Sequence, residues 1–523
     1  MNLARTMLGC LALGVLPSAG GAQRAWRPED RLVIRDYTRV TAVAAGLDRV
    51  FAVTPTAVLL LDARSRRWVQ VAEAPVQGAL RNTLFALVDP LDHSLWGATR
   101  SEWFHYQPEL QLWDRGPAPG GVISIAFDRT DPSIGLFLQT RGGWAIVPRT
   151  GGPAAASPPP AQPVRATRYE DALREIPSLE AFSPQFLASG RRVPARFTSA
   201  ARSADGLGWF LGTDGLGLLW LDQAAIQPVR LTFGLESDRA VALFPAARGV
   251  WVLTDPTDVT GGAVTWIPDD VGEFRSLLGT FGTGLDFTRG YDLVGEGEAL
   301  WAATDAGLIR LQADGATADV LDEGRGLPDQ RVYGLAAWRG TVYAATRGGI
   351  VRVDDTLGVE RIAPDFPGPA FDVAVRGDTV YAGTPQGVFA APPGAADLER
   401  PPESMTRVEA LQGVQRLRWY GDTLAALSRD ALLYRAADGL WQVGPRLSSA
   451  LGVLRALAPW RNGFWIAGQR GVAFVTLAGG PGLALMAPGD LPGEPTDVAV
   501  EGPWLWIATL AGVVRFRLDA VQP

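Results

Sequence analysis

The sequence predicts an all-β protein, a β-propeller built from about eleven four-stranded blades. One phrase recurs eleven times: an apolar run, a polar turn, a Trp- or Tyr-led strand ending in Thr, a Gly turn and another apolar strand. The phrase is clearest at 300–311, 342–353 and 505–516. Most copies lie about 40 residues apart, which is the period of a four-stranded blade.

The strands of one repeat can be assigned in order. Four pieces of ordinary strand length occupy 331–337, 341–346, 349–354 and 358–363, and Gly-containing turns such as Arg339-Gly340 separate them. One residue, the anchor, closes the second strand of every repeat. The anchors are Thr54, Thr99, Thr140, Thr213, Thr254, Thr304, Thr346, Thr384, Ser428, Gly468 and Thr509.

Aromatic residues recur at one position in the second strand of the repeat. The sheet of each blade has two faces, and it buries them by stacking on the neighbouring blades. We interpret this repeated aromatic as packing between blades, because binding residues rarely need identical placement in every blade. The aromatic residues are Trp96, Trp209, Trp251, Trp301, Tyr343, Tyr381, Trp465 and Trp506.

The first residues resemble a secretory signal peptide, residues 1–22, with Arg5 before an apolar core and small residues at its end. A lipoprotein attachment at Cys10 is the alternative. Cleavage after Ala22 leaves no cysteine, hence no disulfide or thiol chemistry, and no later run is apolar enough to span a membrane. We expect a periplasmic or secreted protein.

The chain ends after the third strand of its last blade, at 513–518. The segment Arg31–Asp36 has the length and pattern of the missing strand, so we predict that it pairs there and closes the ring. Eleven blades exceed the usual number in one propeller. Two rings are therefore expected, with blades 1–5 in 23–285 and blades 6–11 in 286–523; a single very wide ring is the alternative.

The longest gap between anchors predicts an insertion at about 151–195. Its Pro-rich part, 151–163, is typical of a stiff linker. The following segment, 168–182, has Tyr169, Leu173, Ile176 and Leu179 at helical spacing, interrupted by Pro177. A short helix that docks on a propeller face would be a lid, a partner-binding arm or a tolerated surface insertion.

The segment 326–354, GLPDQRVYGLAAWRGTVYAATRGGIVRVD, resembles the two-component regulator propeller repeat, and weaker copies cover nearly the whole mature chain. That resemblance implies a periplasmic sensory propeller, which in the family is joined to a membrane helix and a signalling module. Because nothing follows the last blade here, a sensory role would need a separate membrane partner.

Composition excludes several kinds of chemistry. The chain has no lysine, which excludes Schiff-base and P-loop lysine chemistry, and its net charge of -7 argues against a nucleic-acid binder. The two histidines, His93 and His105, are too few for a His-rich metal site and are expected to be structural or exposed. No metal and no cofactor are predicted.

The candidate ligand-binding residues follow from propeller topology. The turn between the second and third strands and the connection entering the innermost strand emerge on one face, so residues after the anchors gather there. They are Arg100, Arg141, Asp214, Asp255, Asp305, Arg347 and Arg429, with Asp329 and Gln330 from an entering loop. Their alternating patches of charge would orient a polar partner.

We therefore expect an exported, non-catalytic propeller that binds a protein partner or an extracellular ligand through this loop face, as a sensory or scaffold subunit. The alternative is a polysaccharide-acting hydrolase or lyase with its site at a propeller mouth. Carboxylates converging at one mouth would favour the enzyme, and an exposed apolar or aromatic patch would favour binding.

Overall fold

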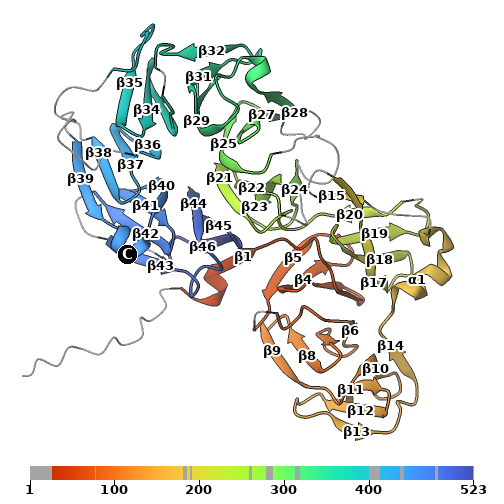
Figure 1. Ribbon diagram of the computed structural model, residues 1–523. Coiled ribbons are helices and arrows are strands. Elements are labelled where there is room, and N and C mark those ends of the chain that lie inside the picture. Colours follow the sequence, from red (N-terminus) through yellow and green to blue (C-terminus); the bar gives the residue numbers. More distant parts are fainter. Residues whose placement is uncertain are drawn as a thin grey trace, which may run out of the picture.

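The computed structural model describes residues 26–523 except 77, 181–184, 189–190, 226, 258–261, 278–286, 313–317, 367, 400–412, 436–440, 478–480 and 522–523. The predicted signal peptide and Cys10 lie outside the described residues. The chain is nearly all-β and consists mainly of four-stranded antiparallel sheets (Figure 1), which confirms the predicted fold class.

Seven sheets have innermost strands that contact one another in a closed order, β21, β25, β29, β33, β36, β40, β44 and again β21. We call these sheets the seven-sheet cycle. Figure 1 shows them arranged around a common centre. Their strands are β21 (Ala240–Ala246), β22 (Gly249–Thr254), β23 (Ala263–Pro268), β24 (Arg275–Ser276); β25 (Gly290–Glu296), β26 (Ala299–Thr304), β27 (Gly307–Gln312), β28 (Ala318–Leu321); β29 (Val332–Trp338), β30 (Thr341–Thr346), β31 (Gly349–Val353), β32 (Val359–Ile362); β33 (Asp372–Arg376), β34 (Thr379–Thr384), β35 (Gly387–Ala391); β36 (Arg416–Tyr420), β37 (Thr423–Leu427), β38 (Ala431–Arg435), β39 (Trp441–Arg446); β40 (Leu454–Trp460), β41 (Gly463–Gly468), β42 (Gly471–Thr476), β43 (Pro481–Met486); and β44 (Pro495–Glu501), β45 (Trp504–Thr509), β46 (Gly512–Arg517) with β1 (Arg31–Ile34).

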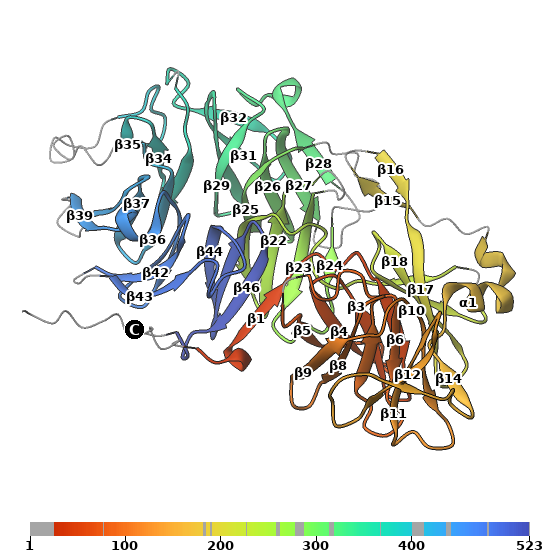
Figure 2. The ribbon, with the colours of Figure 1, turned by 60° about the horizontal axis from the view of Figure 1, so that its bottom comes forward.

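The N-terminal strand completes the last sheet, as predicted. β1 pairs antiparallel with β46, and Val33 lies opposite Val514 in this register. Figure 2 shows β1 beside β46 although the two strands lie at opposite ends of the chain. The pairing covers an edge strand that would otherwise expose unpaired backbone groups.

The other four sheets form what we call the four-sheet group, whose innermost strands contact in the order β17, β2, β6, β10. The short elements of the chain are η1 (Pro28–Asp30), α1 (Tyr169–Glu175), η2 (Pro177–Glu180), η3 (Glu323–Arg325), α2 (Ser448–Leu451) and a hairpin of β15 (Gln185–Ala188) and β16 (Arg191–Pro194). The strands of the four sheets are β2 (Ala42–Ala45), β3 (Arg49–Val53), β4 (Ala57–Asp62), β5 (Trp68–Glu73); β6 (Phe85–Val88), β7 (Leu95–Ala98), β8 (Glu102–Gln107), β9 (Leu112–Pro117); β10 (Val122–Asp128), β11 (Gly135–Thr140), β12 (Gly143–Pro148), β13 (Ala155–Ser157), β14 (Pro163–Arg165); and β17 (Arg196–Arg202), β18 (Gly208–Asp214), β19 (Leu218–Asp222), β20 (Val229–Leu231).

In sequence, the four-sheet group is inserted between β1 and β21, so the chain leaves the seven-sheet cycle once and returns once. The boundary predicted at about residue 285 falls between β24 and β25, whereas contacts join β21 to β25 within the cycle.

The Pro-rich segment 151–163 differs from the expected linker. It supplies β13 and the first residue of β14, which pair with β12 and β10 on opposite edges of one sheet. Edge positions tolerate proline because its missing N–H then faces away from the ladder. The predicted helix is present as α1 and η2, and Ala172 and Leu179 are buried against the β17–β20 sheet.

The repeated aromatic residues of the second strands pack between sheets. Trp96, Trp209, Trp251, Trp301, Trp465 and Trp506 are buried members of six different core clusters, and Tyr343 and Tyr381 pack at the margins of two more. This confirms the structural interpretation of the repeat, since the six tryptophans are buried and the two tyrosines are half-buried between sheets.

Candidate functional site

A pocket of about 640 Å³ lies at one mouth of the seven-sheet cycle. Every one of the seven sheets contributes to its wall, either from the segment entering the innermost strand or from the turn between the second and third strands. These two kinds of segment meet on one face, as the propeller topology predicts. The lining residues are Arg239, Val241, Asp255, Arg289, Gly290, Tyr291, Tyr333, Phe371, Gln415, Arg416, Arg429, Val453, Arg455, Thr496 and Leu510.

A β-bulge aims a side chain into this pocket in five of the seven innermost strands. The extra residue of each bulge lies at the register shift of the first strand pair, and it lines the pocket in every case. Bulges leave one residue out of the ladder and re-aim its side chain, and they are frequent beside functional sites. The bulged residues are Val241, Tyr291, Tyr333, Arg455 and Thr496.

One side of the pocket is aromatic. Tyr291 and Tyr333 meet edge to face with ring centroids 5.1 Å apart, and Tyr333 meets Phe371 in the same way at 5.9 Å. The three rings come from the consecutive strands β25 and β29 and the residue before β33, and each is half-buried. They form a continuous apolar wall that a ring or an apolar side chain of a ligand can contact.

The rest of the pocket is dominated by five arginines. Arg239, Arg289 and Arg429 are exposed, and the guanidinium group of Arg429 is unpaired among the described residues. Arg455 pairs with Glu494 and also donates to the carbonyl oxygen of Pro495 at 3.2 Å. Arginine binds carboxylates, sulfates and phosphates through two parallel N–H donors, so this wall is suited to an anionic group.

Arg416 is a mostly buried lining residue of the pocket. It starts from β36 and donates to the carbonyl oxygen of Tyr291 at 2.9 Å and to that of Tyr333 at 3.3 Å. The acceptors belong to β25 and β29, so this side chain reaches across the centre of the cycle. It therefore ties the aromatic wall to the opposite side of the pocket.

Three buried or half-buried aspartates of the innermost strands β25, β33 and β44 hold neighbouring sheets together. Each accepts the backbone N–H of a leucine in the innermost strand of the next sheet: Asp292 from Leu335 at 2.9 Å, Asp372 from Leu417 at 2.7 Å and Asp497 from Leu243 at 2.8 Å. Burial raises the pKa of Asp372 and of Asp497 to about 6. These carboxylates serve the contacts between sheets and also compensate arginines near the pocket, because Asp292 lies 3.9 Å from Arg416 and Asp372 pairs with Arg418 at 2.9 Å.

Asp255 is the carboxylate among the pocket-lining residues, and it is already engaged. It is buried, accepts the N–H of Gly290 at 2.6 Å and lies 4.0 Å from Arg239. Burial raises its pKa above the ordinary value. Glycoside chemistry needs two carboxyl groups at a defined separation across the substrate, and the lining residues of this pocket supply one.

A second pocket, of about 760 Å³, lies in the four-sheet group. It contains Arg39, Arg81 and Arg100, and it also contains Asp214, which pairs with Arg39 at 3.1 Å. The pocket thus carries both cationic and anionic side chains. The other lining residues are Thr41, Gly78, Ala79, Asn82, Thr83, Leu84, Thr99, Ser101, Glu102 and Thr198.

The structure distributes the nine predicted site residues over three environments. Asp255 and Arg429 line the mouth pocket, and Arg100 and Asp214 line the second pocket. The other five line neither pocket. They are Arg141, Asp305, Asp329, Gln330 and Arg347.

Two of those five have clear local roles. Asp305 accepts the backbone N–H groups of Thr288 at 2.9 Å and Arg289 at 3.0 Å, so it fixes the connection entering β25. Asp329 accepts the N–H of Arg331 at 2.8 Å within its own turn. Both are examples of the turn chemistry that acidic residues commonly provide.

Sequence reasoning missed most of the residues that define the mouth pocket. Arg239, Arg289, Arg416 and Arg455 and the aromatic wall lie at or just before innermost strands, whereas the anchors mark the turns after second strands. A signal was present, because an arginine or aromatic residue recurs just before the apolar run of several repeats. Its orientation depends on the bulge, which the sequence pattern does not reveal.

The two histidines have structural roles, as expected. His93 lies in a turn with its Nδ1 2.8 Å from a carboxylate oxygen of Asp48, and His105 is buried and stacked on Trp96 with ring centroids 4.1 Å apart. Among the described residues, no group of three or more His, Cys, Asp or Glu side chains is arranged to hold a metal ion.

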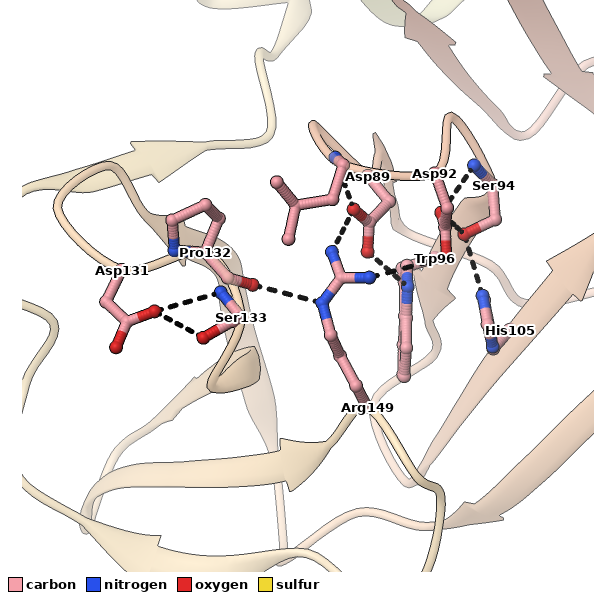
Figure 3. A network of polar contacts seen from close by, with 10 residues as sticks. Asp89, Asp92, Ser94, Trp96, His105, Asp131, Pro132, Ser133 and Arg149 are labelled. Carbon is pink, nitrogen blue, oxygen red and sulfur yellow. Dashed lines mark hydrogen bonds and ion pairs between the residues drawn. The ribbon is translucent and has the colours of Figure 1, made fainter.

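Figure 3 shows that Asp92, Ser94 and His105 form a chain of contacts that differs from a catalytic triad. Ser94 donates its hydroxyl proton to Asp92 at 2.5 Å, so His105 Nε2, 2.7 Å from the same hydroxyl, is assigned as a donor. Histidine must instead accept the hydroxyl proton to activate a nucleophile. The serine is also buried, which leaves it without access to a substrate.

The same network joins two sheets of the four-sheet group (Figure 3). Arg149, directly after β12, reaches Asp89 in the neighbouring sheet and lies 3.3 Å from Asp92, and it donates to the carbonyl oxygen of Pro132 at 3.1 Å. Asp89 is fully buried and also accepts from Trp96 Nε1 at 3.2 Å. The arginine thus satisfies a carboxylate that burial would otherwise penalise.

No helix in the described part of the chain combines the length and the apolar character needed to cross a lipid bilayer. No family model matches the sequence. A search of curated proteins likewise gives no match.

Several solved structures of similar fold are distant in sequence. The extracellular domain of the putative one-component system BT4673 from B. thetaiotaomicron is 12% identical with a TM-score of 0.43, over 93% of this chain and 76% of that one. PorZ, a surface component of the type-IX secretion system of Porphyromonas gingivalis, is 11% identical with a TM-score of 0.42, over 91% and 68%. Virginiamycin B lyase from Staphylococcus aureus is 12% identical with a TM-score of 0.44, over 54% and 95%. These identities and TM-scores are too low to assign the function of any of these proteins to this chain.

Proposed function

We propose that the chain is an exported, non-catalytic β-propeller that binds an anionic group of an extracellular ligand or of a protein partner at the mouth pocket. The observation that carries this proposal is the composition of the pocket wall: five arginines from four different sheets line it together with one carboxylate that is already engaged. Such a binding protein would act as a sensory or scaffold subunit.

The size and lining of the pocket support a binding role. Its volume lies within the range of about 300–1,000 Å³ that is usual for small-molecule sites. An aromatic wall opposite cationic groups suits a ligand that carries an anionic group on a ring or an apolar body.

The same lining gives less support to the alternative, a polysaccharide hydrolase or lyase. That activity needs a general acid and a base or nucleophile at one mouth. The aspartates of the innermost strands β25, β33 and β44 are bonded to the backbones of neighbouring sheets, and Asp255 is the one carboxylate among the lining residues.

Export is proposed from the N-terminal sequence, whose charged start, apolar core and small-residue end are typical of a secretory signal. A mature chain without cysteine is compatible with an oxidising compartment, because no thiol is available for unwanted disulfides.

The proposal is tested by calorimetric titration of the full mature chain with benzene-1,3,5-tricarboxylate, a ring that carries three anionic groups. We expect saturable binding to one site at low salt and weaker binding as salt screens the charges. Arg429→Gln removes an exposed, unpaired pocket arginine and is expected to weaken binding about three- to tenfold.

The matched control is Arg347→Gln. Arg347 also directly follows an anchor residue of the seven-sheet cycle, Thr346 in place of Ser428, and is also exposed, but it lies outside the pocket. Its substitution should leave the affinity unchanged. Equal losses in the two variants, or no saturable binding at all, would contradict a site at the mouth.

A further inference from the structure

We infer that the mouth pocket and the second pocket are two parts of one extended site, which takes an acidic peptide segment of a partner protein with apolar side chains between its acidic ones. The inference rests on the proposed function, because the mouth pocket supplies the first contact. The second pocket would supply another contact to the same peptide.

Two chain segments cross between the seven-sheet cycle and the four-sheet group, and they lie side by side. Asp36 pairs in parallel with Leu235, and the N–H of Leu235 donates to the carbonyl oxygen of Arg35 at 2.9 Å. The N–H of Asp36 donates to the carboxylate of Asp238 at 2.6 Å. These contacts fix the relative position of the two crossing segments.

Each crossing segment ends at one of the pockets. Arg39 lies three residues after Asp36 and lines the second pocket, and Arg239 lies four residues after Leu235 and lines the mouth pocket. At about 3.5 Å per residue, and with about 5 Å between paired strands, these two arginines are at most about 30 Å apart. An extended peptide of about nine residues covers that distance.

The pockets also lie on corresponding faces. The carbonyl oxygen of Thr38 accepts N–H groups of Gly215 and Gly217 in the β18–β19 turn, and that of Asp238 accepts the N–H of Gly512, which directly follows the β45–β46 turn. Both are turns between the second and third strands of a sheet. The crossing segments therefore join the two binding faces to each other.

The chemistry of the two pockets favours a peptide. Arg81 and Arg100 are exposed in the second pocket, and the carboxylate of Asp214 there is compensated by its pairing with Arg39. Glu102 is the other acidic group that a peptide would approach.

Exposed aliphatic side chains in the two pockets favour a peptide over a polysaccharide as the ligand. The pockets contain Leu84, 44% exposed, Val453, 40% exposed, and Leu510, 38% exposed. Aliphatic groups beside arginines match leucine and glutamate side chains of a peptide better than the hydroxyl groups of a sugar chain.

The test compares a four-residue peptide, Glu-Leu-Glu-Ser, with a twelve-residue peptide that contains three copies of it, both capped at their ends, by calorimetric titration. Because a second contact on the same molecule becomes intramolecular, we expect the longer peptide to bind at least about tenfold more tightly. The double variant Arg81→Gln/Arg100→Gln should abolish this gain, so that the long and the short peptide differ in affinity by threefold or less.

Arg141→Gln is the control, because Arg141 follows an anchor in the four-sheet group, is exposed and lies outside the pocket. A gain in affinity of threefold or less would overturn the inference, because three copies of one motif produce it by their number alone. A larger gain in affinity that persists in the double variant would overturn the inference as well. A hyaluronan oligosaccharide of equal length that binds in place of the peptide would overturn the choice of a peptide. Binding of benzene-1,3,5-tricarboxylate without peptide binding would overturn the inference and leave the proposed function intact, whereas failure of both ligands would remove the proposed function itself.

Discussion

At the residue scale, the carboxyl pair in the crossing segments is the most unusual electrostatic feature of the chain. The backbone N–H of Asp36 donates to the carboxylate of Asp238, and Glu236 and Arg35 are the other charged groups that act on the two carboxyl groups. Burial, followed by repulsion from Asp238, raises the pKa of Asp36 to about 7. Thr38 partly opposes this by donating its N–H and hydroxyl to Asp36.

A raised carboxyl pKa makes folding less favourable as pH rises. The folded protein keeps a proton on Asp36 up to about pH 7, whereas the unfolded chain loses it near pH 4, so the free energy of unfolding falls across this window. Asp36→Asn removes the titration and retains an acceptor for Thr38. We expect the variant to be more stable than the parent by about 1 kcal/mol at pH 8, after allowance for its partial exposure, and equal to it near pH 4.

Denaturant unfolding at several pH values measures this effect. Asp62→Asn is the control with the opposite sign, because hydrogen bonds from Ser65 lower the pKa of Asp62. That group stabilises the fold above the unfolded pKa and loses its contribution as pH falls. A parent protein whose stability is flat between pH 4 and pH 8 would contradict the account of Asp36.

At the element scale, the anchor threonine has a specific task that explains its recurrence. Its hydroxyl accepts an N–H in the turn that follows and donates to a carbonyl oxygen at the start of the third strand. In Thr346 these bonds go to Gly348 at 3.1 Å and Gly349 at 2.8 Å. The side chain thus closes the hairpin locally while it is itself fully buried.

Thr346→Val keeps the shape of this side chain and removes both hydrogen bonds. Because the N–H of Gly348 and the carbonyl oxygen of Gly349 then lose a partner, we expect the free energy of unfolding to fall by about 1–2 kcal/mol. Thr140→Val is the matched control, since Thr140 makes the same bonds at an exposed turn where water can replace them. Chemical denaturation of both variants should show the smaller loss for Thr140, and equal losses would contradict the role of burial.

The one glycine among the anchors shows how tertiary packing overrides the repeat. A Cβ at Gly468 would lie 2.7 Å from the carbonyl oxygen of Leu451 and 2.8 Å from its Cβ. Leu451 ends α2, which packs against this sheet. The departure from threonine therefore follows from the helix next to the anchor.

The repeat period predicted the strands, the hairpins and the closing role of β1, because these depend on local pairing and on alternation of apolar residues. It placed Arg429 and Asp255 at a common mouth, because both follow an anchor. It could not separate Arg429 from Arg347, which has the same sequence position but lies outside the pocket. Which turns face a pocket depends on contacts between sheets, and these are not visible in one repeat.

At the scale of the whole molecule, aromatic packing holds the four-sheet group against the seven-sheet cycle. Phe233, in the returning segment, is buried between three rings: Trp68 of the four-sheet group at 4.7 Å, Phe274 of the seven-sheet cycle at 4.5 Å and Tyr37 of the outgoing segment at 5.7 Å. Figure 2 shows the two parts of the chain side by side at this junction. One core cluster accordingly contains residues of both parts.

Phe233→Ala tests whether this junction makes the two parts unfold together. Removing a buried phenylalanine commonly costs about 3–5 kcal/mol, and here the loss falls on the contact between the parts. We expect scanning calorimetry to show one transition for the parent and two for the variant. Phe464→Ala is the control, because Phe464 is equally buried but packs only within the seven-sheet cycle. Because the junction stays intact in Phe464→Ala, that variant should unfold at a lower temperature but still in one transition. A single transition in Phe233→Ala would mean that contacts other than this junction couple the two parts.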